Sequence, residues 1–320
     1  MAKSRLLIIS QGRIFECAVE EGIVWETHRK GSPGKLTFDV IKDEMLGFHE
    51  GDAVRFDYDG KQIFLGYVFT KKRTNNRMIS VTAYDQLRYF KNKNTYIYRN
   101  KTAGQLLLKI AKDFHLKTGI VADTKHVIAS RTEDDQELFT IMDNALSDTT
   151  KNTKEIYVLY DDYGKLCLRN IKELKLNLLI NEDSGETFEY TTSIDENTYN
   201  QIKLIRENKE AGKREVYIAK DSDNINSWGV LQYTDKLEEK ENGKAKADAL
   251  LSLYNRKSRK LHINKVFGDI RVRGGSQVGV QMYLGDLTVA NYMIVESVKH
   301  TFYESDHRMD LSLIGGEFIA

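Results

Sequence analysis

Runs of alternating apolar and polar residues dominate both ends of this chain, and this pattern predicts β-strands rather than helices. Near the N-terminus the runs are LTFDV (36–40), AVRFDYDG (53–60), QIFLGYVFT (62–70) and MISVTAY (78–84). They are rich in residues that favour strands, and glycines and the polar stretch KKRTNNR (71–77) divide them as turns. A set of short strands that each have one apolar face predicts a sheet or a small barrel.

The middle of the chain has a different pattern, which predicts helices. Thr102, followed three residues later by Gln105, is a capping box that begins one helix, and RTEDDQELFTIMDNAL (131–146) predicts a second one. Two apolar runs within 155–171, joined by the turn sequence DDYG, then predict strands. We therefore expect a small α/β domain over residues 95–172.

Strands are predicted again from residue 173 onward, and one helix interrupts them. In GKAKADALLSLYNRKSRK four apolar residues fall on one helical face at the spacing i, i+3, i+4, i+7. These residues are Ala247, Leu250, Leu251 and Tyr254. We expect a first β-barrel-like domain at 1–94 and a second at 173–320, the latter containing this helix near 244–257.

The two β-rich ends also resemble each other. HEGDAVRFDYDGKQIFLGYVFTKKRTNNRMISVTAYD (49–85) and RGGSQVGVQMYLGDLTVANYMIVESVKHTFYESDHRMDLSL (273–313) both begin with Gly, a polar residue and Val at alternate sites. Both continue through Tyr67 or Tyr292 to a polar tip, Arg-Met and a last alternating strand. Any two β-meanders that turn at glycine share some of these features, but the matching order and length favour an internal duplication. The predicted fold class is α+β, mostly β, with two similar small β-barrels flanking a small α/β domain.

Composition limits the possible functional classes. Lys and Arg number 48 and Asp and Glu number 47, so the formal net charge of +1 provides no global field toward nucleic acid or an anionic membrane. The two cysteines, Cys17 and Cys167, cannot supply a disulfide framework or a cysteine-rich zinc site, which suits a reducing compartment. MAKSRLLIISQGR has an apolar run too short for a signal peptide or a membrane span, so we expect the chain to be made and kept in the cytoplasm.

The stretch YMIVESVKHTFYESDHRMDLSL (292–313) contains two histidines and is compatible with a metal site or with a β-hairpin. If SD (305–306) forms the turn, His300 lies opposite Leu311, and His307 lies four residue steps along the same face. At about 3.3 Å per residue the separation is roughly 13 Å, which is too far for two imidazoles to share a zinc ion. We therefore expect a structural histidine at position 300 and no metal site.

The candidate nucleophiles lack the surroundings that catalysis requires. RGGSQVGV contains Ser276, but a nucleophile elbow needs Gly where Val278 stands, and a dinucleotide fingerprint needs Gly at position 276 itself. Cys17 and Cys167 both lie in predicted strands as small residues, and no H-E-x-x-H or H-x-H sequence is present. We therefore expect no catalytic, cofactor-binding or metal-binding residue.

Charged clusters leave two other functions open. A glycosidase needs only two carboxylates about 5–9.5 Å apart, and the sequence does not give that distance. The acidic cluster TEDDQE (132–137) is better explained as the first turn of a helix, where acids complement the helix dipole, or as a solvated loop. YDQLRYFKNKNTYIYRN (84–100) interleaves aromatic and basic residues as single-strand-binding surfaces do, and RKSRK (256–260) is expected to end a helix. A solvated surface fits these basic segments better, because the whole chain is neutral.

Several segments together resemble one family. They are ISVTAYDQLRYFKNKNTYIYRNKTAGQLLLKIAKDF (79–114), NQIKLIREN (200–208), SWGVLQYTDKL (227–237) and YMIVESVKHTF…HRMDLSL (292–313). In order and spacing these segments are similar to the tail hub proteins of contractile phage tails and phage-like elements, of the PBSX XkdQ/YqbQ type, which are related to late-control D-like hub proteins. The similarity covers nearly the whole chain, although no single motif is diagnostic.

The resemblance implies a structural baseplate protein without enzymatic activity or cofactor. It implies a homotrimer in which two similar β-barrels per chain form a ring of pseudo-sixfold symmetry. That ring would contact the hexameric tail tube, the trimeric spike and other baseplate proteins, and DNA could pass through its axial channel without specific binding. The protein would be assembled in the bacterial cytoplasm into a phage tail, a tail-like bacteriocin or another contractile injection particle, with no small-molecule substrate and no membrane contact of its own. The alternative is a tail-associated peptidoglycan hydrolase.

Overall fold

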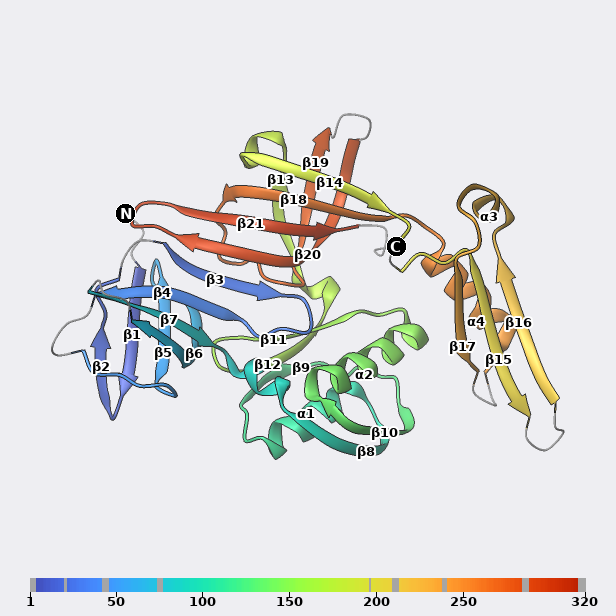
Figure 1. Ribbon diagram of the computed structural model, residues 1–320, viewed down its shortest axis with the longest axis horizontal. Coiled ribbons are helices and arrows are strands. Elements are labelled where there is room, and N and C mark those ends of the chain that lie inside the picture. The colour runs from blue at the N-terminus through green and yellow to red at the C-terminus, as the bar shows by residue number, and fades with distance from the viewer. Residues whose placement is uncertain are drawn as a thin grey trace. The chain divides into compact units, whose positions relative to one another are not determined.

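The computed structural model describes residues 4–19, 22–41, 46–73, 77–195, 197–208, 213–237, 241–283 and 288–315. The chain divides into two compact units: unit 1 comprises Met1–Glu189 and Leu261–Ala320, and unit 2 comprises Tyr190–Lys260. The described residues are mostly β, as the alternating pattern predicted (Figure 1). No helix in the described ranges is long and apolar enough to cross a membrane.

The N-terminal part of unit 1 consists of strands that alternate between a core face and a solvent face. The strands are β1 (Ser4–Ser10), β2 (Arg13–Glu16), β3 (Ile23–His28), β4 (Lys35–Ile41), β5 (Ala53–Tyr58), β6 (Lys61–Arg73) and β7 (Met78–Tyr84). Every second residue of β4 and β7 is buried, and these residues pack with Trp25 and Phe56 in one apolar core. Burial of one face of each strand holds the register, because a slip of one residue would expose that face.

The middle part of unit 1 contains the predicted helices. Its elements are η1 (Gln86–Lys91), β8 (Lys93–Lys101), α1 (Ala103–Asp113), β9 (Thr118–Val121), β10 (Ile128–Glu137), α2 (Leu138–Thr153), β11 (Tyr157–Asp161), β12 (Leu166–Asn170) and η2 (Ile171–Leu174). The capping box of α1 is confirmed: the Gln105 amide donates to the Thr102 hydroxyl at 3.3 Å, and the Thr102 amide donates to the Gln105 side chain at 3.1 Å.

The second helix begins later than the sequence predicted. Residues 131–137 belong to β10, which pairs antiparallel with β8 and has a bulge between Glu133 and Gln136, and α2 begins only at Leu138. The acidic cluster at 132–137 is therefore neither the first turn of a helix nor a loop. Pairing with β8 satisfies the backbone of this segment and overrides its local helix preference.

The C-terminal part of unit 1 belongs to the same sheet as the N-terminal part. Its elements are β13 (Lys175–Ile180), η3 (Glu182–Ser184), β14 (Thr187–Ser193), β18 (Ser258–Phe267), β19 (Gln277–Tyr283), β20 (Thr288–Phe302) and β21 (His307–Ile314). The strand order is β14-β18-β21-β20-β3-β4-β7-β6-β5-β1-β2, with β19 beside β20 and β13 beside β19. Among the described residues no ladder joins the two ends of this order, so the sheet is open. The two separate β-barrels that the sequence predicted are not confirmed.

Unit 2 is inserted into the second β-rich part, because the chain enters it within β14 and leaves it within β18. Its other elements are β15 (Gln201–Asn208), β16 (Lys213–Lys220), α3 (Ser222–Trp228), β17 (Gln232–Lys236) and α4 (Gly243–Tyr254). The predicted helix near 244–257 is α4, whose Ala247 and Leu250 are buried with Ile202 and Leu204 of β15. The division at 94/95 and 172/173 remains a prediction, and it did not include this insertion.

Candidate functional site

Two three-stranded meanders form the first part of the candidate site. The first meander comprises β5, β6 and β7, and the second meander comprises β19, β20 and β21. In each meander the ladder between the middle and the third strand shifts by one residue, between Val68 and Thr70 in β6 and between Val295 and Ser297 in β20. Each middle strand therefore has a β-bulge with one extra residue at the same place. This shared irregularity supports the predicted duplication.

The corner that leads into each meander is also built in the same way. The amide of Gly51 donates to the carbonyl of Val68 at 2.7 Å, and the amide of Gly275 donates to the carbonyl of Val295 at 2.7 Å. Both glycines have φ values in the left-handed region, +92° and +93°, which other residues rarely adopt. The two corners therefore share the same backbone hydrogen bond and nearly the same φ. In each meander this bond connects the start of the first strand to the valine that precedes the bulge in the middle strand.

A polar side chain closes each corner. The His49 amide donates to Asp52 Oδ2 at 2.6 Å, and the Arg273 amide donates to Ser276 Oγ at 3.0 Å. These are side-chain turns of the Asx and Ser/Thr types, which hold the backbone locally. Ser276 is buried, and its hydroxyl holds a turn rather than facing a substrate.

The shared bulge corrects the alignment that the sequence suggested. Because Val68 is equivalent to Val295, Tyr67 is equivalent to Ile294 and not to Tyr292. The opening pattern of Gly and a polar residue was aligned correctly, since it forms the shared corner. The middle of the alignment failed because alternation has a period of two residues and does not distinguish registers that differ by two.

The two histidines of the C-terminal hairpin contact each other, so the predicted separation of roughly 13 Å was wrong. Phe302 lies opposite His307 and His300 lies opposite Met309, which differs by two residues from the predicted register. The turn is Tyr303–Asp306, so it has four residues between the paired strands rather than being centred on 305–306. As a result His300 Nδ1 lies 2.9 Å from His307 Nε2.

Both imidazoles are neutral and occupy a structural position. Because the Val272 carbonyl can only accept, His300 Nε2 carries a proton and donates to it at 2.9 Å, and His300 Nδ1 accepts from His307 Nε2. Burial lowers the pKa of His300 to about 3 and that of His307 to about 4. His300 stacks on Trp25 with ring centroids 4.8 Å apart, and His307 stacks on Phe302 at 4.3 Å. Within the described ranges no group of three side chains that could hold a metal ion occurs.

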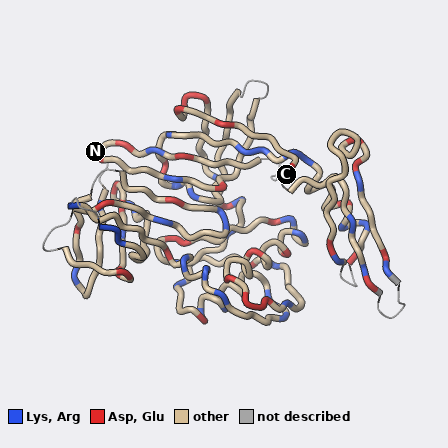
Figure 2. The backbone as a smooth tube through the Cα atoms, viewed as in Figure 1, with Lys and Arg blue, Asp and Glu red and all other residues tan. Residues whose placement is uncertain are grey.

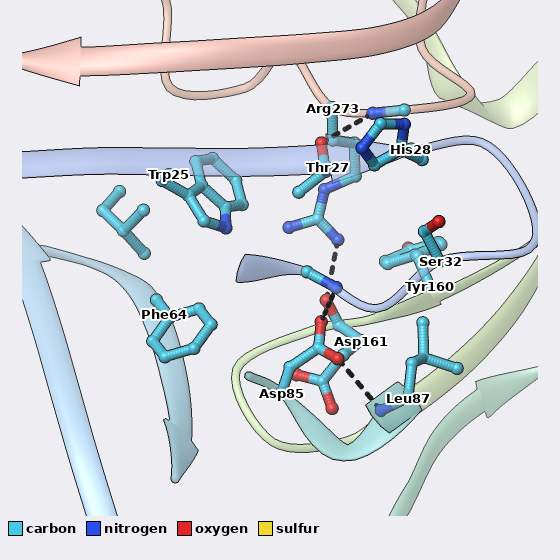
Figure 3. A pocket seen from close by; sticks show the side chains of 13 residues that line it. Trp25, Thr27, His28, Ser32, Phe64, Asp85, Leu87, Tyr160, Asp161 and Arg273 are labelled. Atoms are coloured by element: carbon cyan, nitrogen blue, oxygen red, sulfur yellow. Dashed lines mark hydrogen bonds between the residues drawn. The ribbon is translucent and has the colours of Figure 1, made fainter. Parts of the chain in front are cut away.

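A second cluster, which the sequence did not indicate, joins three parts of unit 1. This polar junction consists of Asp85, which follows β7, Asp161, which ends β11, and Arg273, which precedes the second meander (Figure 3). The three side chains line a cavity of about 20 Å³, which has room for about one water molecule. A cavity of this size is too small for a sugar or a nucleotide.

Asp85 is buried, and both of its carboxylate oxygens accept backbone hydrogen bonds. The Gly34 amide donates to Oδ2 and the Leu87 amide donates to Oδ1, each at 2.9 Å. Burial, and next the neighbouring charge of Asp161, raise the pKa of Asp85 well above its ordinary value. A Cβ atom at position 34 would lie 2.3 Å from Asp85 Oδ2, so only glycine fits there.

Asp161 and Arg273 complete the polar junction. Asp161 accepts from the Gly164 amide at 2.6 Å and from the Gln86 side chain at 3.2 Å, and burial raises the pKa of Asp161 to about 6. Arg273 donates to the backbone carbonyl of Asp161 at 3.3 Å, and its guanidinium lies 4.4 Å from the centroid of the Tyr160 ring. A buried network of hydrogen bonds of this kind holds the three parts of unit 1 that it joins in fixed positions.

The remaining candidate residues also lie in structural positions. Burial raises the pKa of the Cys17 thiol to about 11 and also raises that of Cys167, so both thiols stay protonated at neutral pH. In segment 84–100, three aromatic residues are buried and cannot stack on bases. They are Phe90, Tyr96 and Tyr98. The basic run at 256–260 begins after α4 and continues into β18, so the prediction that it ends a helix was wrong.

The charges of the described chain are mixed along its length. Figure 2 shows Lys and Arg residues interspersed with Asp and Glu along the strands and helices. This distribution agrees with the formal net charge of +1. A protein with such a surface recognises its partners through local contacts rather than through a long-range field.

Comparison with known proteins finds relatives of nearly the whole chain. A family model described as YQBQ-like matches residues 23–314. The uncharacterized protein YqbQ of Bacillus subtilis (strain 168) is 30% identical over 322 residues, which cover 97% of this chain and 96% of the relative. The phage-like element PBSX protein XkdQ of the same organism is 28% identical over 306 residues, which cover 92% of each chain. The solved structure of the prophage MuSo2 43 kDa tail protein from Shewanella oneidensis shares the fold, with a TM-score of 0.71 at 12% identity over 99% of this chain and 100% of that one.

Proposed function

Because the chain belongs to the YQBQ-like family, we propose that it is a structural tail protein, the hub that joins the tail tube to the central spike of a contractile phage tail or tail-like particle. Two comparisons support a role in a tail: one relative is named as a protein of the phage-like element PBSX, and the fold is shared with a prophage tail protein. The position at the hub is the finer part of the proposal, and it rests on the duplicated meander.

The duplication carries the proposal because it changes the symmetry that an oligomer of this chain presents. Three copies related by a threefold axis would present six similar meanders around that axis. Such a ring can contact a sixfold tube on one side, where each meander meets one tube subunit, and a threefold spike on the other side. Each meander would form a wall of one of two barrels, and the channel on the axis would let DNA pass without specific contacts.

A hub acts through interfaces, and the described surface offers apolar side chains for them. Large exposed apolar residues include Ile14, Ile97, Ile120, Val230 and Tyr283. Interfaces of assembled proteins cover residues of this kind. The histidine pair and the polar junction then serve to hold the two meanders rigidly to the rest of unit 1.

The alternative function, a peptidoglycan hydrolase, receives no support from the buried carboxylates. Asp85 and Asp161 are close together and have raised pKa values, as the acid of a glycosidase has. The cavity that they line is about 20 Å³, so a glycan cannot reach them. We propose no turnover at this site.

Mass photometry tests the proposal directly, with the full chain alone and after mixing with the tube and spike proteins of the same particle. We expect a trimer of about 111 kDa, three times the chain mass of 36.9 kDa, and further species that contain both partners. A chain that stays monomeric at micromolar concentration in the presence of both partners would contradict the proposal.

A further inference from the structure

The middle strand of the second meander has two different neighbours along one edge. β21 pairs with β20 on one side, and on the opposite side β19 covers β20 only as far as Ile294. Beyond the bulge, β3 takes over that edge and pairs antiparallel with Ser297–Phe302, with His28 opposite Ser297. β3 thereby joins the second meander to the first, because β3 also pairs with β4.

In the described part of the chain, the same edge of the first meander has no partner strand. β7 pairs with β6 on one side through Arg73, and on the other side the ladder with β5 ends at Tyr67. No described strand pairs with Thr70–Arg73 on that second side. Thr70, Lys72 and Arg73 are exposed. By the shared bulge, Thr70 is the equivalent of Ser297, the first residue that β3 covers.

The strand equivalent to β3 is β14. β3 pairs with β4, which pairs with the last strand of the first meander, and β14 pairs with β18, which pairs with the last strand of the second meander. β14 lies at the end of the sheet order, and within the described part of the chain β18 is its sole neighbour. Thr187, Phe188 and Glu189 of β14 are exposed, and Phe188 is 46% exposed.

The unpaired edge of β6 and the unpaired edge of β14 are not paired with each other within one chain. Six strands separate them in the sheet order, and among the described residues no ladder joins them. Their charges are complementary, because Lys72 and Arg73 are exposed on β6 and Glu189 is exposed on β14. An unpaired edge is a ready site for a strand of another chain.

We propose that β14 of one copy pairs antiparallel with Thr70–Arg73 of β6 in the next copy, as β3 pairs with Ser297–Phe302 within one chain. This inference rests on the proposed ring of the hub and gives the contact that closes it. His28 and Ser193 are the last residues of β3 and β14, so the equivalence places Ser193 opposite Thr70 of the neighbouring copy. A single sheet would then continue from copy to copy around the ring.

Disulfide trapping in the full chain tests the pairing. In the double variant Thr70→Cys/Ser193→Cys we expect a covalent trimer on non-reducing gels, since each interface would have one disulfide. Thr70→Cys/Thr187→Cys, which places the second cysteine at the other end of β14, is the matched control and should remain a monomer on the gel. The two single variants control for Cys17 and Cys167.

Mass photometry of the same variants separates the inference from the proposed function. A trimer in solution without the specific covalent trimer would overturn the pairing of β14 with β6 and leave the hub intact. A chain that stays monomeric in the presence of the tube and spike proteins would contradict the hub itself. Equal cross-linking of both double variants would also overturn the pairing, because it would mean random collision rather than one register.

Charge reversal provides a second test that does not depend on cysteine. Lys72→Glu/Arg73→Glu should weaken trimer formation by at least tenfold in dissociation constant, because two cations of the proposed interface become anions on the strand that pairs with β14, which carries the exposed Glu189. Arg13→Glu on β2, the edge strand at the other end of the sheet order, is the control and should leave the trimer unchanged. Equal trimer stability in both variants would overturn the proposal.

Discussion

Gly51 and Gly275 occupy the same corner of the two meanders, but their surroundings differ. Each glycine amide donates a hydrogen bond of 2.7 Å to the carbonyl of the valine before the bulge. Their φ values are +92° and +93°. A Cβ atom at position 275 would lie 2.6 Å from Val158 Cγ1, whereas a Cβ atom at position 51 would meet no described atom within 4 Å. The second corner is packed against the middle part of unit 1, whereas no described residue packs on the first corner at this position.

This pair separates backbone strain from packing. Gly51→Ala should lower the free energy of unfolding by about 1–2 kcal/mol, the cost of a left-handed φ for alanine. Gly275→Ala should lower it by about 2–5 kcal/mol, because overpacking against Val158 adds about 1–3 kcal/mol to the same strain. Urea unfolding of the two variants measures the difference. Equal losses would mean that the Gly275 corner is not packed as described.

The polar junction predicts a pH dependence of stability. Burial raises the folded pKa of Asp161 to about 6, above the unfolded value near 3.9. The contribution of Asp161 to the free energy of unfolding is therefore fully present below pH 3.9 and is lost as the pH rises through 6. Relative to Asp161→Asn, the natural chain should therefore lose up to about 3 kcal/mol of stability between pH 4 and pH 7. Asp59→Asn, which removes an exposed carboxylate outside the polar junction, is the control and should leave the pH dependence unchanged. A stability difference that is constant with pH would contradict a buried carboxyl at position 161.

The histidine pair predicts the opposite slope in acid. The folded pKa values of His300 and His307 are lowered to about 3 and about 4, below the unfolded value near 6.5. Their contribution to the free energy of unfolding is therefore present above pH 6.5 and is lost as the pH falls toward 4, by about 6 kcal/mol in total, or about 3 kcal/mol for each histidine. His300→Phe/His307→Leu should remove this part of the acid sensitivity, and the exposed His262→Gln should not. Thermal unfolding between pH 4 and pH 7 measures it, and an unchanged slope in the double variant would contradict the buried neutral pair.

Removal of one histidine alone tests the hydrogen bond between the two rings. In His307→Phe the acceptor His300 Nδ1 remains buried and loses its donor, which should cost about 1–3 kcal/mol of unfolding free energy. His307→Gln, which can still donate to Nδ1, should recover part of that loss. Equal stability of the two variants at pH 7 would contradict the assigned donor and acceptor.

The sequence predicted the strands, the first and last helices and the duplication, because these depend on local periodicity and on caps such as Thr102. It did not predict the hairpin register. The turn at Tyr303–Asp306 has four residues, and a shift of two residues preserves the apolar face, so alternation cannot exclude it. Because the observed register differs from the predicted one by two residues, His300 and His307 lie within hydrogen-bond distance of each other rather than far apart.

The polar junction was not predicted because its members belong to three separate parts of the chain. The one local signal was Asp85, a carboxylate placed directly after the alternating strand MISVTAY, where it accepts from the Leu87 amide. Nothing in the sequence near Asp161 or Arg273 indicates that they share a cavity. Contacts of this kind depend on tertiary packing, which periodicity does not encode. The start of α2 was also misplaced for this reason, since pairing with β8 decides the conformation of residues 131–137.

In the proposed hub, one chain supplies two equivalent meanders to a threefold ring. Electron cryomicroscopy of the assembled particle, or of the purified oligomer, would show this ring in full. We expect three copies around one axis with the first and second meanders alternating at intervals of about 60° and a continuous sheet from β14 of one copy to β6 of the next. A particle in which the two meanders lie at different radii or face different partners would contradict it.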